Sequence, residues 1–317
     1  MMPGIRVWHF YLINLFLPHL ESYIFDGFAI SSNIKGSYKQ LYMRKIILSL
    51  LISQLIIFSV NSQTKDKKPY DPYSVKLDGN YLKGYWQDTK NIYSAPFRWK
   101  AKDWIKTATV LGISTGLYFG ADQQLKDWSQ REKNETSEAI SKSFEIFGNG
   151  RYPVFTTGAL YLAGVAIKKE KPKRVALLIL ESYLITGVTA QLSKFLTSRE
   201  RPWSKLPYNV WYGPRIKDPK ASFFSGHSST VWAFATVFAL EYSKHKWVAP
   251  VAYTIATLSS ISRIHDNAHW ASDVFFGSVI GYYMTRSIVR NHTKNNRTSF
   301  FPVVGRQGMQ LGFVHKF

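Results

Sequence analysis

Apolar residues lie in long runs divided by short charged segments, and this alternation predicts helices. Six runs have about the length that crosses the hydrocarbon layer of a bilayer. They cover residues 104–121, 152–168, 174–197, 223–243, 247–264 and 270–290. The Gly, Ser and Thr residues within them suit close helix packing in a membrane and also suit a bundle in water. We expect an all-α helical bundle of about six helices, spanning residues 104–290 and embedded in a membrane.

The segments on either side of the bundle have different patterns. Residues 63–103 are polar and aromatic with several prolines, which predicts an extended polar segment. Residues 291–317 begin with a basic linker. Apolar and polar residues then alternate from Phe300 to Phe317 around Gly305 and Gly308, which predicts a short C-terminal β-hairpin.

The N-terminal region contains a pattern typical of export. A basic tip at Met43-Arg44-Lys45 precedes an apolar run up to Val60, and small residues follow near Ser62. This is the form of a secretory signal. We interpret residues 43–62 as a signal peptide or an N-terminal anchor, and residues 1–42 as an upstream extension.

The charges of the loops predict an orientation. Residues 168–174 hold five basic side chains and one acidic, whereas residues 121–151 hold five basic and six acidic. The positive-inside rule places the first segment in the cytoplasm and the second outside. Loops 198–222 and 265–269 then also face outward. A signal peptide would export residues 64–103, whereas six spans would leave them inside, so both hold only if residues 104–121 do not cross or the bundle is not threaded through the bilayer.

Composition narrows the partners and the chemistry. The chain has 41 Lys and Arg against 20 Asp and Glu, a net charge of +21. Such an excess indicates an anionic partner, such as nucleic acid, an anionic membrane or a phosphorylated substrate. The chain has no cysteine, which excludes disulfide scaffolds, zinc–thiolate sites and thiol nucleophiles.

Three short motifs fall at ends of the predicted helices. The first, Lys194-x6-Arg201-Pro202, places two cations about two helical turns apart. The second, Ser225-Gly226-His227, opens a helix whose free N–H groups form an anion site. Each motif alone is typical of an ordinary helix end.

The third motif runs from Arg263 to His269 and Asp273. A carboxylate four residues after a histidine on one helix face fixes the tautomer and leaves the other ring nitrogen free as a nucleophile or base. His265 and Asp266 suggest a metal, but no residue with convincing spacing supplies further ligands. We therefore expect no metal and no cofactor at this site.

Together these motifs favour phosphoryl transfer, which requires neutralisation of the phosphoryl charge and an in-line arrangement of nucleophile and leaving group. The motifs Lys-x6-Arg-Pro, Ser-Gly-His and Ser-Arg-x5-His-x3-Asp resemble the three signatures of the type-2 phosphatidic acid phosphatase family, which includes the vanadium haloperoxidases. One difference is Phe224, where the family usually has proline before Ser-Gly-His.

The resemblance implies a role for each matching residue. His269 would attack phosphorus and form a phosphohistidine, with Asp273 orienting it, and His227 would protonate the leaving oxygen. The remaining residues would bind the phosphate oxygens: Lys194, Arg201, Ser225, Gly226 and Arg263.

The resulting prediction is a phosphoric monoester hydrolase of the cell envelope that acts without a metal on phosphomonoesters or pyrophosphates of lipids. We expect a membrane location and no nucleic-acid partner, with the site on the periplasmic face of the inner membrane. A soluble periplasmic acid phosphatase is the main alternative, since a small-molecule phosphate would fit the same chemistry. Two minor alternatives are a haloperoxidase and a non-enzymatic protein that binds anionic lipids.

Overall fold

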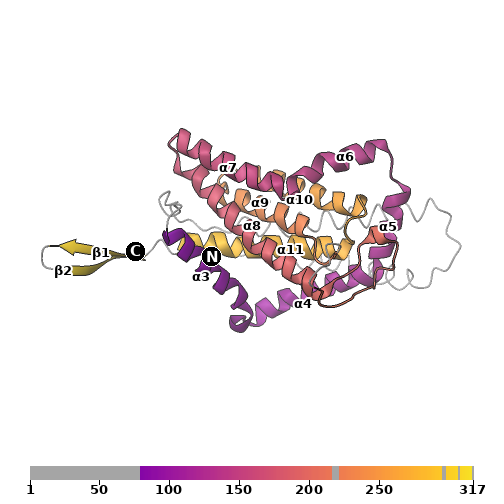
Figure 1. The fold of residues 1–317 in the computed structure, drawn as a ribbon, viewed down its shortest axis with the longest axis horizontal. Helices are drawn as coiled ribbons and strands as arrows, with labels where there is room; N and C mark the ends of the chain where they lie inside the picture. Colours follow the sequence, from indigo (N-terminus) through magenta and orange to yellow (C-terminus); the bar gives the residue numbers. More distant parts are fainter. Residues whose placement is uncertain (1–78, 216–220, 295–297, 306–307, 316–317) are drawn as a thin grey trace, which may run out of the picture. The chain divides into compact units, whose positions relative to one another are not determined.

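The computed structural model describes residues 79–215, 221–294, 298–305 and 308–315. The predicted upstream extension, the signal peptide or anchor and residues 63–78 lie outside these ranges. The described α-helices follow one another along the chain (Figure 1). They are α3 Gly79–Tyr93, α4 Ala101–Gly120, α5 Asp122–Arg131, α6 Glu135–Glu145, α7 Arg151–Ala166, α8 Glu170–Thr197, α9 Gly226–Glu241, α10 Val248–His265 and α11 Ala271–Lys294.

The six expected bundle helices are confirmed as α4, α7, α8, α9, α10 and α11. Helix α9 is central, because it packs against α8, α10 and α11. A helix with apolar or small residues on all sides is suited to such a buried position. Its Trp232 is fully buried, stacks on Tyr253 with ring centroids 5.4 Å apart and donates a hydrogen bond to Ser260.

Two glycines bring α11 close to α9. A Cβ at Gly277 would overlap the backbone oxygen of Ser225, and a Cβ at Gly281 would overlap the backbone of Ser229. Glycines four residues apart lie on the same face of a helix and allow two helix backbones to approach. This contact also fixes the start of α9 against the first turns of α11, where two of the sequence motifs meet.

The prediction of an extended segment is wrong for residues 79–93, which form α3. Tyr81 is buried and donates a hydrogen bond of 3.0 Å to the backbone oxygen of Leu177 in α8. Asp88, two helical turns later, accepts a hydrogen bond of 2.8 Å from Asn291 in α11. These tertiary contacts stabilise a helix that local composition does not predict.

Residues 121–151, expected to be an outer loop, contain α5, α6 and the short 3-10 helix Ile146–Gly148. Asn134 caps α6, because its side chain accepts a hydrogen bond from the backbone of Ser137 while the Ser137 hydroxyl accepts one from the backbone of Asn134. Leu125 anchors α5 in the bundle with 4% of its surface exposed. The segment therefore covers one end of the bundle.

The C-terminal hairpin is confirmed. Strands β1 Thr298–Gly305 and β2 Gly308–His315 pair antiparallel, with Thr298 opposite His315 and Gly305 opposite Gly308. Gly305 and Gly308 form the last pair of this ladder.

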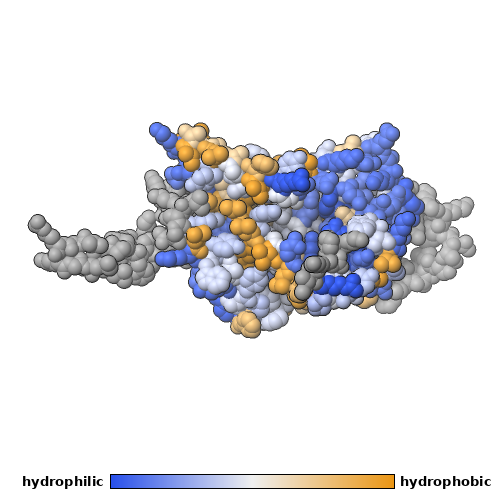
Figure 2. Space-filling model, viewed as in Figure 1, coloured by the Kyte–Doolittle hydropathy of each residue, from blue (hydrophilic) through white to orange (hydrophobic). Residues whose placement is uncertain are grey.

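Large apolar side chains remain exposed on the outer faces of α4, α7 and α8. On α8 they recur every fourth residue, at Leu184, Val188 and Leu192, and so form one stripe. Figure 2 shows apolar residues across the face that α7 and α8 occupy, and hydrophilic residues around α6. Within the described ranges, α8 is the helix that is both long and apolar enough to cross a membrane.

Candidate active site

The site lies where the end of α8, the start of α9, the end of α10 and the start of α11 meet. Helix α8 ends at Thr197, and its C-cap residue Ser198 has a left-handed φ of 39°, so Lys194 lies in the last turn and Arg201 lies beyond the helix. The predicted separation of the two cations by about two turns of one helix is therefore wrong. The loop nevertheless returns Arg201 to the site, where its guanidinium contacts the backbone oxygen of Ala268 at 3.4 Å.

His269 lies just before α11, in the short connection after α10. Its Nδ1 atom is 3.3 Å from the hydroxyl of Ser222 and 4.0 Å from the nearest carboxylate oxygen of Asp273. Ser222 in turn donates a hydrogen bond to that same oxygen. The predicted direct His–Asp hydrogen bond is therefore replaced by a Ser222 bridge, because His269 is not on the helix that carries Asp273. All three side chains are buried.

A buried guanidinium fixes Asp273 from its other side. Arg199 Nη1 lies 2.5 Å from Asp273 Oδ1, and Nη2 lies 2.7 Å from Asp122 Oδ2 in α5. Asp122 also accepts hydrogen bonds from the backbone and hydroxyl of Ser272, at 2.8 and 2.6 Å. Because Arg199 and both carboxylates are almost completely buried, this network is rigid and can hold the acceptor of Ser222 in place.

Aromatic rings enclose the same guanidinium. The centre of the Arg199 guanidinium is 4.9 Å from the ring centroids of Tyr118 and Trp211 and 5.4 Å from that of Trp270. Cation–π attraction in a desolvated site stabilises this charge. The three rings also exclude water from the Arg199–Asp273 ion pair.

The start of α9 has the predicted capping geometry. Ser225 is the N-cap residue, and its hydroxyl accepts a hydrogen bond of 3.2 Å from the backbone N–H of Ser228. The Lys194 ammonium nitrogen lies 3.9 Å from the position that a Cβ on Gly226 would occupy. A cation thus lies beside a helix N-terminus, and both attract an anion.

His227 occupies the first turn of α9. Its Nε2 atom is 3.3 Å from the hydroxyl of Ser259 in α10, and its ring also hydrogen-bonds the backbone of Glu145. A Cβ at Gly148 would overlap the His227 ring, so residue 148 must be small for this ring position. The covering segment after α6 therefore helps to place His227.

Arg263, near the end of α10, forms ion pairs with Glu145 at 3.1 Å and with Asp266. In this structure it is thus engaged by carboxylates, and a phosphate would share or replace them. His265 lies 3.0 Å from the hydroxyl of Ser137 and 3.2 Å from Asp266. These contacts join α6 to the end of α10, so His265 has a structural environment rather than a metal-binding one.

The pKa of His269 is well below its usual value, and burial is the largest cause. The positive charges of Arg201, Lys194 and Arg263 lower it further, and His227 acts in the same direction. The imidazole is therefore neutral at neutral pH, which is the state that a nucleophile requires. The pKa of His269 thus responds to four of the residues that the motifs contain.

Burial raises the pKa of Asp122 to about 6. The negative charge of Asp273 acts in the same direction, while Arg199 and Ser272 oppose it. One guanidinium between two buried carboxylates leaves one negative charge unbalanced, and a carboxyl in that position retains its proton to a higher pH.

Sequence reasoning missed three residues of the site: Arg199, Asp122 and Ser222. Arg199 lies within the first motif, between Lys194 and Arg201. Its presence as a third cation in that motif could have identified it as a site residue. Asp122 and Ser222 had no such signal, because only the packing of α5 and of the loop before α9 brings them to Asp273.

The fold and the site define a helical bundle with an anion-binding, histidine-containing centre at the meeting point of four helices. Residues 175–297 match the family model described as the PAP2 superfamily. All three motifs lie within this matched segment.

Curated relatives are named as lipid phosphatases. A lipid A 1-phosphatase of Porphyromonas gingivalis is 42% identical over 24% of this chain and 19% of its own length. An undecaprenyl-diphosphatase of Sulfolobus acidocaldarius is 26% identical over 37% of this chain and 54% of its own. The chain thus spans about a fifth and about half of these two relatives.

A solved structure of similar fold is the first transmembrane PAP2 type phosphatidylglycerolphosphate phosphatase from Bacillus subtilis. It is 19% identical, with a TM-score of 0.45, and the match covers 59% of this chain and 94% of that one.

Proposed function

We propose that the chain is a phosphatase that hydrolyses phosphomonoester or pyrophosphate groups of lipids through a phosphohistidine intermediate. The observation that carries the proposal is the environment of His269, a buried neutral imidazole whose Nδ1 atom faces the Ser222–Asp273 pair and which several cations surround. That arrangement leaves Nε2 to meet the substrate.

In the first step, Nε2 of His269 attacks phosphorus as the bond from phosphorus to the leaving oxygen breaks. His227 donates a proton to that oxygen, so the alcohol or phosphate leaves in neutral or less charged form. In the second step His227 takes a proton from water, the resulting hydroxide attacks phosphorus, and the bond to His269 breaks. Free phosphate and neutral His269 are restored.

The charge of the transferring phosphoryl group requires stabilisation in both steps. The positive charges of Lys194 and Arg201 both act on His269. The Lys194 ammonium also lies beside Gly226, the first residue of α9, where the helix N-terminus attracts an anion. Arg263 is the third cation, once a phosphate competes with its carboxylate partners. These groups supply the electrostatic stabilisation without any metal.

A groove beside the site supports a lipid substrate. It has a volume of about 670 Å³, lies between α7, α9 and α10, and is lined by apolar side chains such as Phe147, Val231, Phe234 and Val251. Val231 is one helical turn after His227, and Phe147 precedes Gly148, which packs against the His227 ring. An acyl or prenyl chain in this groove would leave its phosphate beside His227. The two curated relatives, a lipid A 1-phosphatase and an undecaprenyl-diphosphatase, are also named for lipid substrates.

The test compares His269→Ala with His227→Ala on two substrates, an alkyl lipid phosphate and p-nitrophenyl phosphate. Loss of the nucleophile in His269→Ala should abolish turnover of both substrates. It should also prevent labelling of the protein by a substrate that carries a radioactive phosphoryl group. Loss of the general acid should slow the alkyl substrate by roughly 10²–10⁴-fold. In a single turnover, release of the aryl leaving group should be slowed much less, because that leaving group needs no proton.

Both variants should elute and unfold like the wild type, which controls for misfolding. Near-normal turnover by folded His269→Ala would refute the mechanism. Equal losses of the single-turnover rate on both substrates in His227→Ala would remove His227 from the general-acid role.

A further inference from the structure

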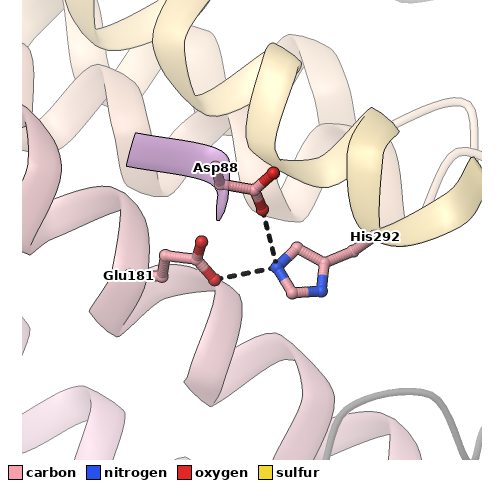
Figure 3. A group of neighbouring side chains, drawn as sticks. All are labelled: Asp88, Glu181 and His292. Carbon is pink, nitrogen blue, oxygen red and sulfur yellow. Dashed lines mark hydrogen bonds and ion pairs between the residues drawn. The ribbon is translucent and has the colours of Figure 1, made fainter. Parts of the chain in front are cut away.

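Three metal-binding side chains from three helices meet away from the phosphate site. Asp88 lies on α3, Glu181 on α8 and His292 on α11 (Figure 3). The Nε2 atom of His292 is 2.9 Å from Glu181 Oε2 and 3.1 Å from Asp88 Oδ2. One ligand atom from each residue lies within 4.8 Å of the others. The chain thus brings two carboxylates and an imidazole nitrogen to one point.

The cluster is buried and one of its oxygens lacks a donor. Glu181 is 0% exposed and Asp88 is 3% exposed. Among the described residues, no hydrogen-bond donor reaches Glu181 Oε1, and Figure 3 shows the Glu181 carboxylate directed toward the group. A buried carboxylate oxygen without a partner is costly, since its desolvation is not compensated.

The charges of the cluster also favour a bound cation. Among the described residues, both carboxylates form their ion pairs with His292. When both carboxylates are ionised, even a protonated His292 leaves the cluster with a net charge of −1, which burial disfavours. A divalent cation bound by neutral His292 and both carboxylates would bring that net charge to zero, and charged ligands in the interior are normally paired or bound to metal.

The distances suit a small transition metal. Ligands about 2.0–2.1 Å from a tetrahedral zinc ion lie roughly 3.3 Å from one another. The two distances to His292 Nε2 are slightly shorter than this, so outward shifts of a few tenths of an ångström would admit the ion. His and carboxylate ligands together suit Zn²⁺ and its first-row neighbours better than they suit Ca²⁺ or Mg²⁺.

Neighbouring residues hold two of the ligands in place, as outer contacts do in metal sites. Asn291 donates a hydrogen bond of 2.8 Å to Asp88 Oδ1, the oxygen that does not face His292. Gly84, one turn before Asp88, packs near the imidazole, since a Cβ there would lie 3.8 Å from His292 Cε1.

We propose that Asp88, Glu181 and His292 bind one divalent transition-metal ion, best matched by Zn²⁺, which fastens α3 to α8 and α11. Glu181 and Lys194 lie about 20 Å apart along α8, so the ion is structural and takes no part in phosphoryl transfer. The site is thus independent of the metal-free chemistry at His269.

The test uses full-length protein stripped with a chelator and then titrated with Zn²⁺. Elemental analysis after gel filtration should find about one zinc per chain, and the ion should raise the midpoint of thermal unfolding by several degrees, because it binds only the folded state. His292→Gln should weaken Zn²⁺ binding at least roughly 100-fold, more than the loss of an outer contact. His245→Gln, which changes an exposed histidine outside the cluster, should bind zinc like the wild type.

Wild-type protein that retains no zinc and shows no change in its unfolding midpoint would overturn the proposal, and the group would then be an ion triad around protonated His292. An equal zinc effect in wild type and His292→Gln would also overturn it, since the ion would bind elsewhere. Neither result depends on turnover. Stripped protein that is folded yet inactive, and regains turnover with zinc, would instead contradict the metal-independent function.

Discussion

At the scale of single residues, the site depends on side chains that reach His269 through others. Ser222 bridges His269 and Asp273, and Arg199 joins Asp273 to Asp122. Asp122 lies on α5, outside the matched family segment. Its position shows that the covering helices contribute to the support of the active site as well as to its enclosure.

The raised pKa of Asp122 predicts a pH dependence of stability. The pKa of this carboxyl is 3.8 in an unfolded chain and about 6 in the folded protein, so folding strengthens its hold on the proton. Its stabilising contribution is fully present below pH 3.8 and is lost as the pH rises through about 6. Across that window the loss is on the order of 3 kcal/mol, at about 1.4 kcal/mol per pKa unit.

Asp122→Asn cannot ionise and should lack this component. Between pH 4 and pH 7, the unfolding midpoint of the wild type should fall relative to that of Asp122→Asn, measured by thermal denaturation at each pH. Asp127→Asn, which removes an exposed carboxyl from the same helix, should keep the wild-type slope. Parallel profiles for Asp122→Asn and the wild type would show that Asp122 stays ionised throughout.

At the scale of elements, the approach of α11 to α9 places the histidine motifs side by side. His227 begins one helix and Asp273 lies in the first turn of the other, and Gly277 and Gly281 set the separation of the two. Because backbone atoms of α9 occupy the space beside both glycines, a side chain there cannot be accommodated by a rotamer change.

We therefore expect Gly281→Ala to destabilise the protein by roughly 1–3 kcal/mol, as overpacking does. The matched control is Gly158→Ala on α7, where a Cβ would meet nothing within 4 Å. That substitution should be neutral or stabilise by up to about 1 kcal/mol, through helix propensity. Thermal unfolding of the two variants checks this, and a shift of both in the same direction would contradict the close contact.

At the scale of the whole molecule, the distribution of apolar surface bears on the location of the protein. The outer face of α8 exposes Leu184, Val188 and Leu192, with Val188 at 58%. Exposed apolar stripes of this length on a helix suit contact with lipid. Among the described helices, α8 has the length and composition to cross a membrane. The soluble acid phosphatase is the alternative against which the membrane location is tested.

Fractionation and one substitution distinguish these two locations. In a bacterial host, the protein should stay with the membranes after osmotic shock and require detergent for release. Val188→Lys should reduce membrane insertion, at about 2.5–3.5 kcal/mol for a charge at the centre of a span. In a water-soluble bundle the same exposed change should alter stability by no more than about 0.5 kcal/mol. Release by osmotic shock, with Val188→Lys tolerated, would favour the soluble enzyme.

The sequence by itself determined the bundle helices and the C-terminal hairpin, and it supplied the side chains to which we assign the proposed chemistry. Apolar runs, the Ser225 cap and the alternation after Phe300 act over a few residues, so local pattern suffices to predict them. The three motifs likewise identified His227 and His269 without knowledge of their neighbours.

Only the tertiary structure decided what surrounds those residues. The Ser222 bridge, the burial of Arg199 between two carboxylates and the meeting of Asp88 with Glu181 and His292 each join segments far apart in the chain. Residues 79–93 form a helix for the same reason, since contacts with α8 and α11 stabilise it. A local sequence pattern does not predict such contacts, because they form only when distant segments of the chain pack together.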